Sequence, residues 1–391
     1  MEDRIILISK DVLMKAYLTP YGNQYFEMPN LSELAQKGTV FNRHYTAAPS
    51  TAMAFTSMST GLYAYQTDRK KYVEVSEFEG KTIYDQLNAL GYECHIIWDP
   101  RYVYMAQRYS KCYGRQTKIH NIPLTKETPK HRPGKFDEII NNENDKLEAI
   151  FNFEKIIREL INNSDKTFVW VHFPHTIAGS NVWGSDMGTF DKMIEVARRY
   201  FPDEGIYITA DHGHMNGMHG KYGYGFDVFE NAICIPLITP RIANYSTIDY
   251  PTSNTQLSEI IIDNRITQKE YVLSETAYYM QPHRKLAIIK DNYKYVYEKQ
   301  THKEFLYDVL WDAMETTNLI SPDVYDTDRR CYFPSNLRWF YPYWNESVRY
   351  IDYFRNIKQE MWRDAPWLIE SKERIIHRAK FTYSRVMNFI K

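Results

Sequence analysis

The stretch RIILISKD, residues 4–11, decides the fold class. Its apolar run ends in polar residues, as expected for a strand buried on both faces of a parallel sheet, and Asp11 lies just past the carboxyl end of that strand. Residues 31–38, LSELAQKG, then place apolar side chains at helical spacing before a glycine stop, and residues 39–45, TVFNRHY, resume a β pattern. Together these segments predict one β-α-β unit.

The same alternation continues along the chain. Three further helical patterns each precede a β pattern, at residues 82–90 and 94–98, 145–162 and 167–173, and 190–200 and 205–211. Such alternation predicts an α/β fold, with a mostly parallel sheet sandwiched by helices.

The pattern changes beyond about residue 265. Short strands are expected at residues 270–275, 284–290, 293–298 and 304–309, and aromatic-rich helices after Asp326. The sequence therefore predicts a main domain at residues 1–265 and a smaller C-terminal α+β subdomain at residues 266–391. Residues 371–391 place apolar residues among basic ones, typical of a helix that caps the core or meets an anionic membrane surface.

Composition excludes several classes of protein. The 391 residues include 48 Lys and Arg against 49 Asp and Glu, so the net charge of -1 gives no overall field for a nucleic acid polymer. The four cysteines form no CxxC pair, which argues against a disulfide framework or a thiolate zinc site. No continuous apolar stretch reaches the ~18–20 residues of a transmembrane segment, and the acidic start is unlike a signal peptide. These features predict a cytoplasmic protein.

Four side chains suited to metal chemistry follow predicted strands or begin a predicted helix. Asp11 follows the first strand, Thr51 begins the helical stretch that runs to Thr60, and Asp211 and His212 follow the strand at 205–211. Strand carboxyl ends converge on the ligand crevice of an open α/β sheet. Two carboxylates, one hydroxyl and one imidazole suit one divalent metal ion, with Mn²⁺ or Zn²⁺ favoured and Ca²⁺ or Mg²⁺ less so.

The position of Thr51 supports two interpretations. A divalent cation would lower the pKa of its hydroxyl and make it a nucleophile, and a helix start favours a phosphoryl or sulfuryl group. Alternatively, Ser50 or Thr51 simply caps the helix, which is the commoner use of such residues. The two roles are compatible.

The segments together resemble the sulfatase branch of the alkaline phosphatase superfamily, over most of the first 320 residues. Residues 5–13, IILISKDVL, resemble the first metal-binding strand of the family. Thr51 precedes Gly61 by ten residues, which is the spacing of the family nucleophile from its Thr-Gly pair. Residues 209–213, TADHG, resemble the later metal pair, and His219 continues the pattern. The resemblance implies an alkaline phosphatase/sulfatase-like catalytic domain at residues 1–265.

Departures from the family pattern point to the chemistry. Sulfatases use a formylglycine made from Cys or Ser followed by Pro and Arg, whereas Thr51 is followed by Ala52 and Met53. Thr cannot form that aldehyde, so the resemblance favours the phosphodiesterases and phosphotransferases with a Thr nucleophile and a covalent phospho-Thr intermediate. Asp11 stands where sulfatases commonly have two acidic residues, and Asp186 is followed by Phe190 where two-zinc relatives have His. One metal ion is therefore expected.

The resemblance also suggests roles for five basic side chains. His219 and His175 are expected to be catalytic, and His172, His214 and Lys221 to bind substrate. For each histidine a structural role is a comparable alternative, and for Lys221 a solvated surface position.

We therefore expect a metal-dependent phosphoester hydrolase or phosphotransferase that acts on a small-molecule or glycan ester. One alternative is a sulfate-ester hydrolase without formylglycine. Another is a catalytically silent binding protein of the same fold, although such a protein has no need to keep Asp11, Thr51, Asp211 and His212 together. The sequence leaves open whether the chain is a homo-oligomer.

Overall fold

The structure of the chain is a computed structural model. It describes residues 1–63, 66, 81–99, 116–122, 124, 143–175, 186–276, 284–320, 324–326, 331–333 and 344–362. The helix expected at residues 371–391 lies outside these ranges.

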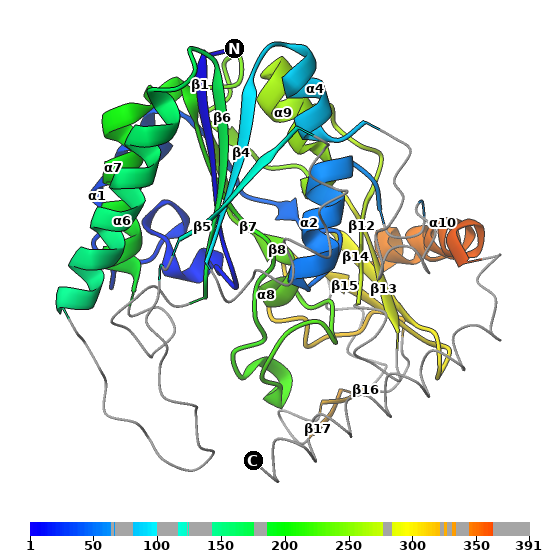
Figure 1. The fold of residues 1–391 in the computed structure, drawn as a ribbon. Coiled ribbons are helices and arrows are strands. Elements are labelled where there is room, and N and C mark those ends of the chain that lie inside the picture. The colour runs from blue at the N-terminus through cyan, green and yellow to red at the C-terminus, as the bar shows by residue number, and fades with distance from the viewer. Residues whose placement is uncertain are drawn as a thin grey trace, which may run out of the picture.

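The centre of the fold is an eight-stranded sheet with the strand order β10-β2-β9-β7-β1-β6-β4-β5 (Figure 1). Its strands are β1 (Arg4–Lys10), β2 (Thr39–Phe41), β4 (Glu93–Trp98), β5 (Lys118–Asn121), β6 (Thr167–Phe173), β7 (Ile206–Ala210), β9 (Leu237–Thr239) and β10 (Thr247–Ile248). β9 alone among them runs antiparallel to its neighbours, β2 and β7. The predicted mostly parallel sheet is confirmed.

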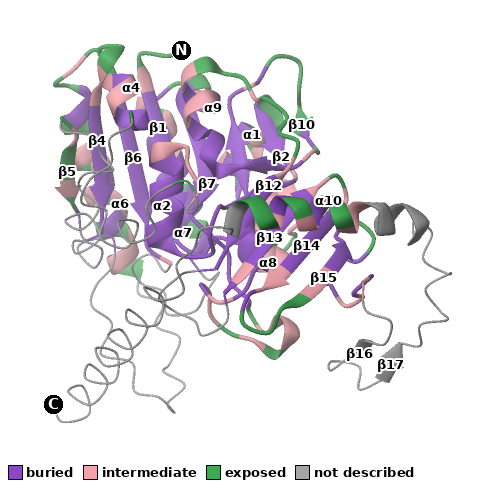
Figure 2. Cartoon of the chain, turned by 90° about the vertical axis from the view of Figure 1, so that its right-hand side faces the viewer, coloured by how far each residue is buried: buried purple, intermediate pink, exposed green. Residues whose placement is uncertain are grey.

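Helices cover both faces of this sheet, as predicted (Figure 1). The helices on one face are α1 (Pro29–Lys37), α6 (Glu143–Ile161) and α7 (Met187–Tyr200), and those on the other are α2 (Thr51–Thr60), α4 (Ile83–Ala89) and α9 (Leu257–Asp263). Because side chains alternate along a strand, β1 sends Ile6 and Ile8 into the first layer and Ile5 and Leu7 into the second. Figure 2 shows these central strands as buried.

A second sheet holds the expected C-terminal strands. Its four antiparallel strands are β12 (Val272–Glu275), β13 (Lys285–Lys290), β14 (Tyr293–Glu298) and β15 (Lys303–Asp308). Helix α10 (Trp344–Trp362) packs on its outer side, with Phe354 stacked on Tyr295 at a centroid distance of 5.6 Å (Figure 1). The backbone of Glu275 donates to Ala47 O at 3.0 Å, so this sheet touches the segment that leads to Thr51. The domain boundary at residue 265 stays a prediction.

The remaining elements are short. They are β3 (His44–Tyr45), β8 (Cys234–Ile235), β11 (Thr252–Ser253), β16 (Val324–Asp326), β17 (Cys331–Phe333), α8 (Glu230–Ile233), and the 3-10 turns η1 (Lys15–Tyr17), η2 (Thr19–Tyr21), η6 (Asp203–Gly205), η7 (Met218–Gly220) and η8 (Asn254–Gln256). Among the described residues, no helix has the length and apolarity needed to cross a membrane.

The buried His44 gives the fold a measurable acid sensitivity. Its Nδ1 lies 2.9 Å from Thr252 Oγ1, and burial, assisted by the charge of Lys15, lowers the pKa of His44 to about 3. In the unfolded chain His44 binds a proton near pH 6.5, whereas in the folded chain it stays neutral down to about pH 3. The free energy of unfolding therefore decreases as the pH falls from about 6.5 towards 3.

We predict that His44→Asn reduces the loss of stability between pH 7 and pH 5 by about 2 kcal/mol, the cost of protonating one such histidine on unfolding. Urea unfolding at both pH values measures this difference. Other titrating groups are common to both proteins and cancel. An equal pH dependence in wild type and variant would contradict the assignment.

Candidate functional site

Four predicted side chains meet at the carboxyl edge of the main sheet. Asp11 follows β1, Thr51 begins α2, and Asp211 and His212 follow β7. His212 Nε2 lies 3.1 Å from Thr51 Oγ1, 3.6 Å from Asp11 Oδ1 and 3.4 Å from Asp211 Oδ2. All four side chains are buried. We call these residues the four-residue cluster.

The imidazole of His212 has a defined tautomer. Its Nδ1 lies 2.8 Å from the carbonyl oxygen of Gly213, and a carbonyl can only accept. In the neutral imidazole Nδ1 therefore carries the hydrogen and donates it, and the lone pair of Nε2 faces Thr51 and the two carboxylates. A backbone carbonyl that orients the far nitrogen is the usual support for a metal-binding histidine.

The two carboxylates are close together in a water-poor setting. Burial raises the pKa of Asp211 to about 6, and the neighbouring Asp11 charge acts in the same direction, whereas His212 opposes it. Asp11, Asp211 and His212 each offer one ligand atom, and these three atoms lie within 4.8 Å of one another. This donor set, two hard oxygens and one imidazole, fits one divalent cation, which would offset the repulsion between the acids.

A strained turn at Val12, directly after Asp11, forms a hydrogen bond to Asp211. Val12 has φ of 60°, a left-handed conformation that is rare for a β-branched residue and costs about 1–3 kcal/mol. In this turn the Val12 amide donates to Asp211 Oδ1 at 3.3 Å, and the His212 amide donates to the same oxygen at 2.8 Å. Both bonds aim Asp211 at the cluster.

Thr51 does not act as a helix cap in this structure. Ser50 occupies the N-cap position of α2 without a side-chain capping hydrogen bond, and Thr51 Oγ1 is turned to His212 instead. The N-terminal end of the helix dipole adds positive potential around this hydroxyl, which favours an anionic ligand. Phe55 anchors the helix one turn further on, stacked on Trp170 at 4.7 Å.

The loop after β7 is held against α8. A Cβ atom on Gly213 would lie 1.9 Å from the carbonyl oxygen of Asn231, so only glycine fits there. The Gly213 amide donates to Ala232 O at 2.9 Å, and the His214 amide donates to Asn231 O at 3.1 Å. This close contact fixes the backbone that carries Asp211 and His212.

The two predicted histidines on β6 and after it also reach the cluster. His172 is fully buried, with Nδ1 2.9 Å from Ser9 Oγ and Nε2 4.0 Å from Asp211 Oδ2. Burial lowers the pKa of His172 to about 3, so its imidazole is neutral. His175 lies at the rim, 39% exposed, with Nδ1 3.7 Å from Asp11 Oδ2. The predicted substrate and catalytic roles of both stay predictions.

The other three predicted residues make contacts of their own. Both ring nitrogens of His214 face backbone amides, those of Asn216 and Gly223, and burial lowers the pKa of His214 to about 4. His219 stacks on Phe229 at 3.9 Å. These contacts organise the loop, and direct contact of either histidine with substrate stays a prediction.

Lys221 is part of a charged group that includes residues not predicted. Its Nζ lies 2.6 Å from Asp227 Oδ2, and Lys285 Nζ, from β13, lies 2.7 Å from the same oxygen. No sequence spacing links residue 285 to residue 221, because the contact is made between β13 and the loop before α8.

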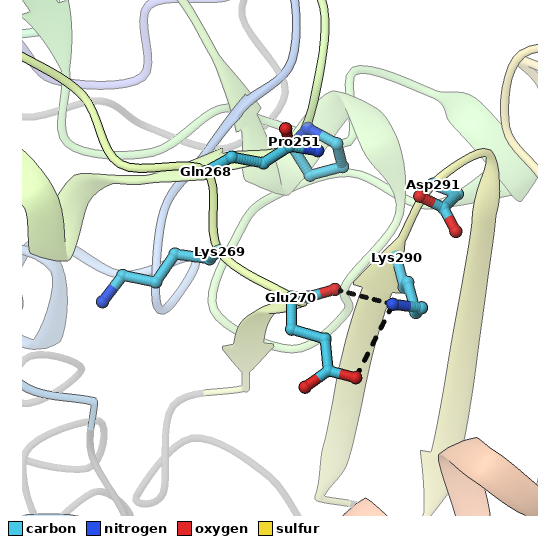
Figure 3. Close-up of a pocket in the computed structure, with 6 residues that line it drawn as sticks. All are labelled: Pro251, Gln268, Lys269, Glu270, Lys290 and Asp291. Atoms are coloured by element: carbon cyan, nitrogen blue, oxygen red, sulfur yellow. Dashed lines mark hydrogen bonds and ion pairs between the residues drawn. The ribbon is translucent and has the colours of Figure 1, made fainter.

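One hollow of about 320 Å³ lies away from these residues. Figure 3 shows its lining, which is Pro251, Gln268, Lys269, Glu270, Lys290 and Asp291. Lys290 Nζ lies 3.7 Å from Glu270 Oε1, and no member of the four-residue cluster lines the hollow.

Comparison with known proteins supports the family resemblance. Residues 3–181 match the sequence model of the sulfatase family. An arylsulfatase of Clostridium perfringens is 33% identical over 98 residues, which are 25% of this chain and 20% of that relative. The chain thus spans about a fifth of the curated relative that it matches.

Solved structures share the fold of this chain over most of its length. A 2-O GAG sulfatase superposes with a TM-score of 0.67 over 94% of each chain, at 14% sequence identity. The phosphonate monoester hydrolase of Agrobacterium radiobacter gives a TM-score of 0.63 over 92% of this chain and 96% of that one, at 15% identity. The predicted alkaline-phosphatase-like fold class is confirmed.

We predict that Gly213→Ala destabilises the protein by about 2–4 kcal/mol, because the new methyl group collides with backbone that cannot move without displacing α8. Gly188→Ala is the matched control: a Cβ atom at Gly188, in the first turn of α7, meets nothing within 4 Å. The control should leave stability unchanged or raise it, by up to about 1 kcal/mol. Urea unfolding of both variants measures this, and equal stabilities would contradict the close-contact argument.

Proposed function

We propose that the chain is a metal-dependent hydrolase or transferase of phosphate esters with Thr51 as its nucleophile. The observation that carries this proposal is the 3.1 Å contact between Thr51 Oγ1 and His212 Nε2, inside a buried group that also contains Asp11 and Asp211. A helix-capping threonine has no need of such surroundings. The sulfatase-like fold supports ester cleavage at a tetrahedral oxyanion.

The proposed reaction has two displacements. Thr51 Oγ passes its proton to solvent and forms a bond to phosphorus, while the bond from phosphorus to the ester oxygen breaks and the alcohol leaves with a proton from the general acid. His175 is the proposed proton donor, because its imidazole is exposed and lies at the rim beside Asp11. Water or an acceptor hydroxyl then attacks the phospho-Thr51 and releases the threonine.

Asp11, Asp211, His212 and Thr51 are the proposed holders of the metal ion. A divalent cation supplies positive charge that lowers the pKa of the threonine hydroxyl and offsets the charge of the substrate. Mn²⁺ and Zn²⁺ are proposed ahead of Ca²⁺ and Mg²⁺, because one of the donors is an imidazole nitrogen.

Sulfate-ester hydrolysis is the second candidate, supported by the sulfatase family match at residues 3–181. Since Thr cannot become formylglycine, this reaction would have to proceed by direct attack of Thr51 on sulfur. A small-molecule or glycan ester is the proposed substrate in either case. A cytoplasmic location stays a prediction.

We predict that Thr51→Ala lowers kcat by at least ~10³-fold, because the nucleophile is lost. Thr51→Ser keeps a hydroxyl and should retain part of the activity. Thr60→Ala, at the other end of α2, should leave kcat unchanged, since the hydrogen bonds of Thr60 Oγ1 among the described residues are local: it donates to the carbonyl of Thr56 and accepts from the amide of Leu62.

The assay is a panel of 4-nitrophenyl phosphate, bis(4-nitrophenyl) phosphate, a phenylphosphonate ester and 4-nitrocatechol sulfate, with Mn²⁺ present. Preference for a phosphorus ester supports the first candidate and preference for the sulfate supports the second. Acid quenching followed by mass spectrometry should show phosphate on Thr51. Undiminished turnover in Thr51→Ala would refute the nucleophile.

We predict that Asp211→Asn weakens Mn²⁺ binding by more than the ~10–100-fold that loss of an outer-shell partner costs, since a charged ligand is removed. Asp263→Asn, an exposed position at the end of α9, is the control for a changed net charge and should bind Mn²⁺ as the wild type does. Titration calorimetry on chelator-treated protein measures both affinities. Equal affinities would place the metal elsewhere.

A further inference from the structure

A buried lysine lies next to the metal-site aspartate. Lys10, the last residue of β1, is 2% exposed. Its Nζ lies 3.2 Å from Asp186 Oδ2, at the start of α7, and donates a hydrogen bond to the carbonyl oxygen of His175 at 2.6 Å. Burying an ammonium and a carboxylate costs several kcal/mol in desolvation, and an apolar pair often packs as well. This pair therefore needs an explanation beyond stability.

Strand alternation explains why Lys10 and Asp11 have different environments. Even-numbered residues of β1 face the layer of α1, α6 and α7, as Ile6 and Ile8 do, and Lys10 continues this row towards α7. Asp11, past the end of the strand, faces His212 on the other side. The amide of Asp11 also donates to Phe173 O at 2.9 Å, which holds the ends of β1 and β6 together.

His175 is therefore held at two points by consecutive residues. Lys10 Nζ binds its backbone carbonyl at 2.6 Å, and the Asp11 carboxylate lies 3.7 Å from its ring nitrogen Nδ1. Its side chain is 39% exposed, so side-chain packing restrains it less than it restrains the fully buried His172. The position of its ring depends on its backbone, and Lys10 is the side chain that fixes this backbone from the sheet.

We propose that Lys10 is a positioning residue that holds the backbone of His175 so that its imidazole faces the four-residue cluster. Asp186 provides the counter-charge that makes the buried ammonium tolerable at this depth. The proposal rests on the proposed function only in the role it gives to His175; the placement of the ring is a separate, structural claim.

The first test reads the ring position directly and requires no activity. In metal-free protein labelled with ¹⁵N-histidine, the ring signals of His175 are assigned by their absence in His175→Ala. Lys10→Met should shift these signals. Arg198→Met, which removes ion pairs to Glu33 and Asp203 at the other end of α7, should leave them in place. Unshifted signals in folded Lys10→Met would overturn the proposal.

The second test is a double-mutant cycle on kcat/KM. Lys10→Met should lower kcat/KM by about 10–100-fold in the wild-type background, as expected for a catalytic group displaced by about 1 Å. In the His175→Ala background the same substitution should change it less than about 3-fold, because the residue through which Lys10 acts is gone. Full, independent losses in both backgrounds would show that Lys10 acts on something other than His175.

Folding of the variant has its own control, because Lys10→Met removes the ammonium that faces the buried carboxylate of Asp186. The double variant Lys10→Met/Asp186→Asn removes both charges, and it should also shift the His175 signals and lower kcat/KM. A folded double variant with wild-type signals would overturn the proposal. If the wild type cleaves no ester but the signals shift as expected, the proposed function fails and the positioning role stands.

Discussion

Two carboxylates buried beside one imidazole impose the central constraint on this molecule. Asp11 and Asp211 each lie within 3.6 Å of His212 Nε2, at depths where charge is poorly solvated. Burial raises the pKa of Asp211, and repulsion from the Asp11 charge adds to this rise. A fold holds such a group together only if the surrounding backbone fixes it. Two residues show this constraint: Val12 has a left-handed backbone conformation, and Gly213 lies so close to Asn231 that no Cβ atom fits.

The layered architecture supplies the rest of the support. β1 and β7 are hydrogen-bonded neighbours in the sheet, so residues that follow their carboxyl ends lie together whatever their separation in sequence. Helix α2 brings Thr51 from the face that also receives Ile5 and Leu7. The C-terminal sheet reaches the same region through the Glu275 amide and Ala47 O, and through Lys285 and Asp227. The site therefore depends on both sheets.

The sequence predicted the parts of the site that depend on strand ends. Asp11 and Asp211 could be placed together because each follows a strongly apolar strand of a parallel sheet, and the start of α2 was visible in the helical stretch from Thr51. The depth of His172 could not be predicted. It shares a face with Ser9 and Trp170, and only the packing of α2 and the pairing of β4 with β6 show that this face is closed by Phe55 and Trp98.

Contacts between side chains that are distant in the sequence could not be predicted either. Lys10 ends an apolar strand, so a buried charge with a partner could be expected there, but nothing in the spacing points to Asp186 or to the carbonyl of His175. The same holds for Lys285, whose contact with Asp227 depends on how β13 meets the loop before α8. Periodicity locates elements, whereas such pairs depend on the packing between them.

The contact between Thr51 and His212 has two chemical interpretations, and they exclude each other at any one moment. Without a cation, the Nε2 lone pair can accept the threonine hydrogen, so His212 is a base. A cation held by the proposed ligands would use that lone pair in coordination, and His212 could then take no proton. The threonine proton would pass to another group or to solvent, and the cation would make the hydroxyl more acidic. Since one nitrogen cannot serve both purposes, the exposed His175 beside Asp11 is better placed than His212 to exchange protons with solvent during turnover. The burial of the two rings thus supports the proposed roles, binding for His212 and proton transfer for His175, and under that proposal the position of His175 matters for activity.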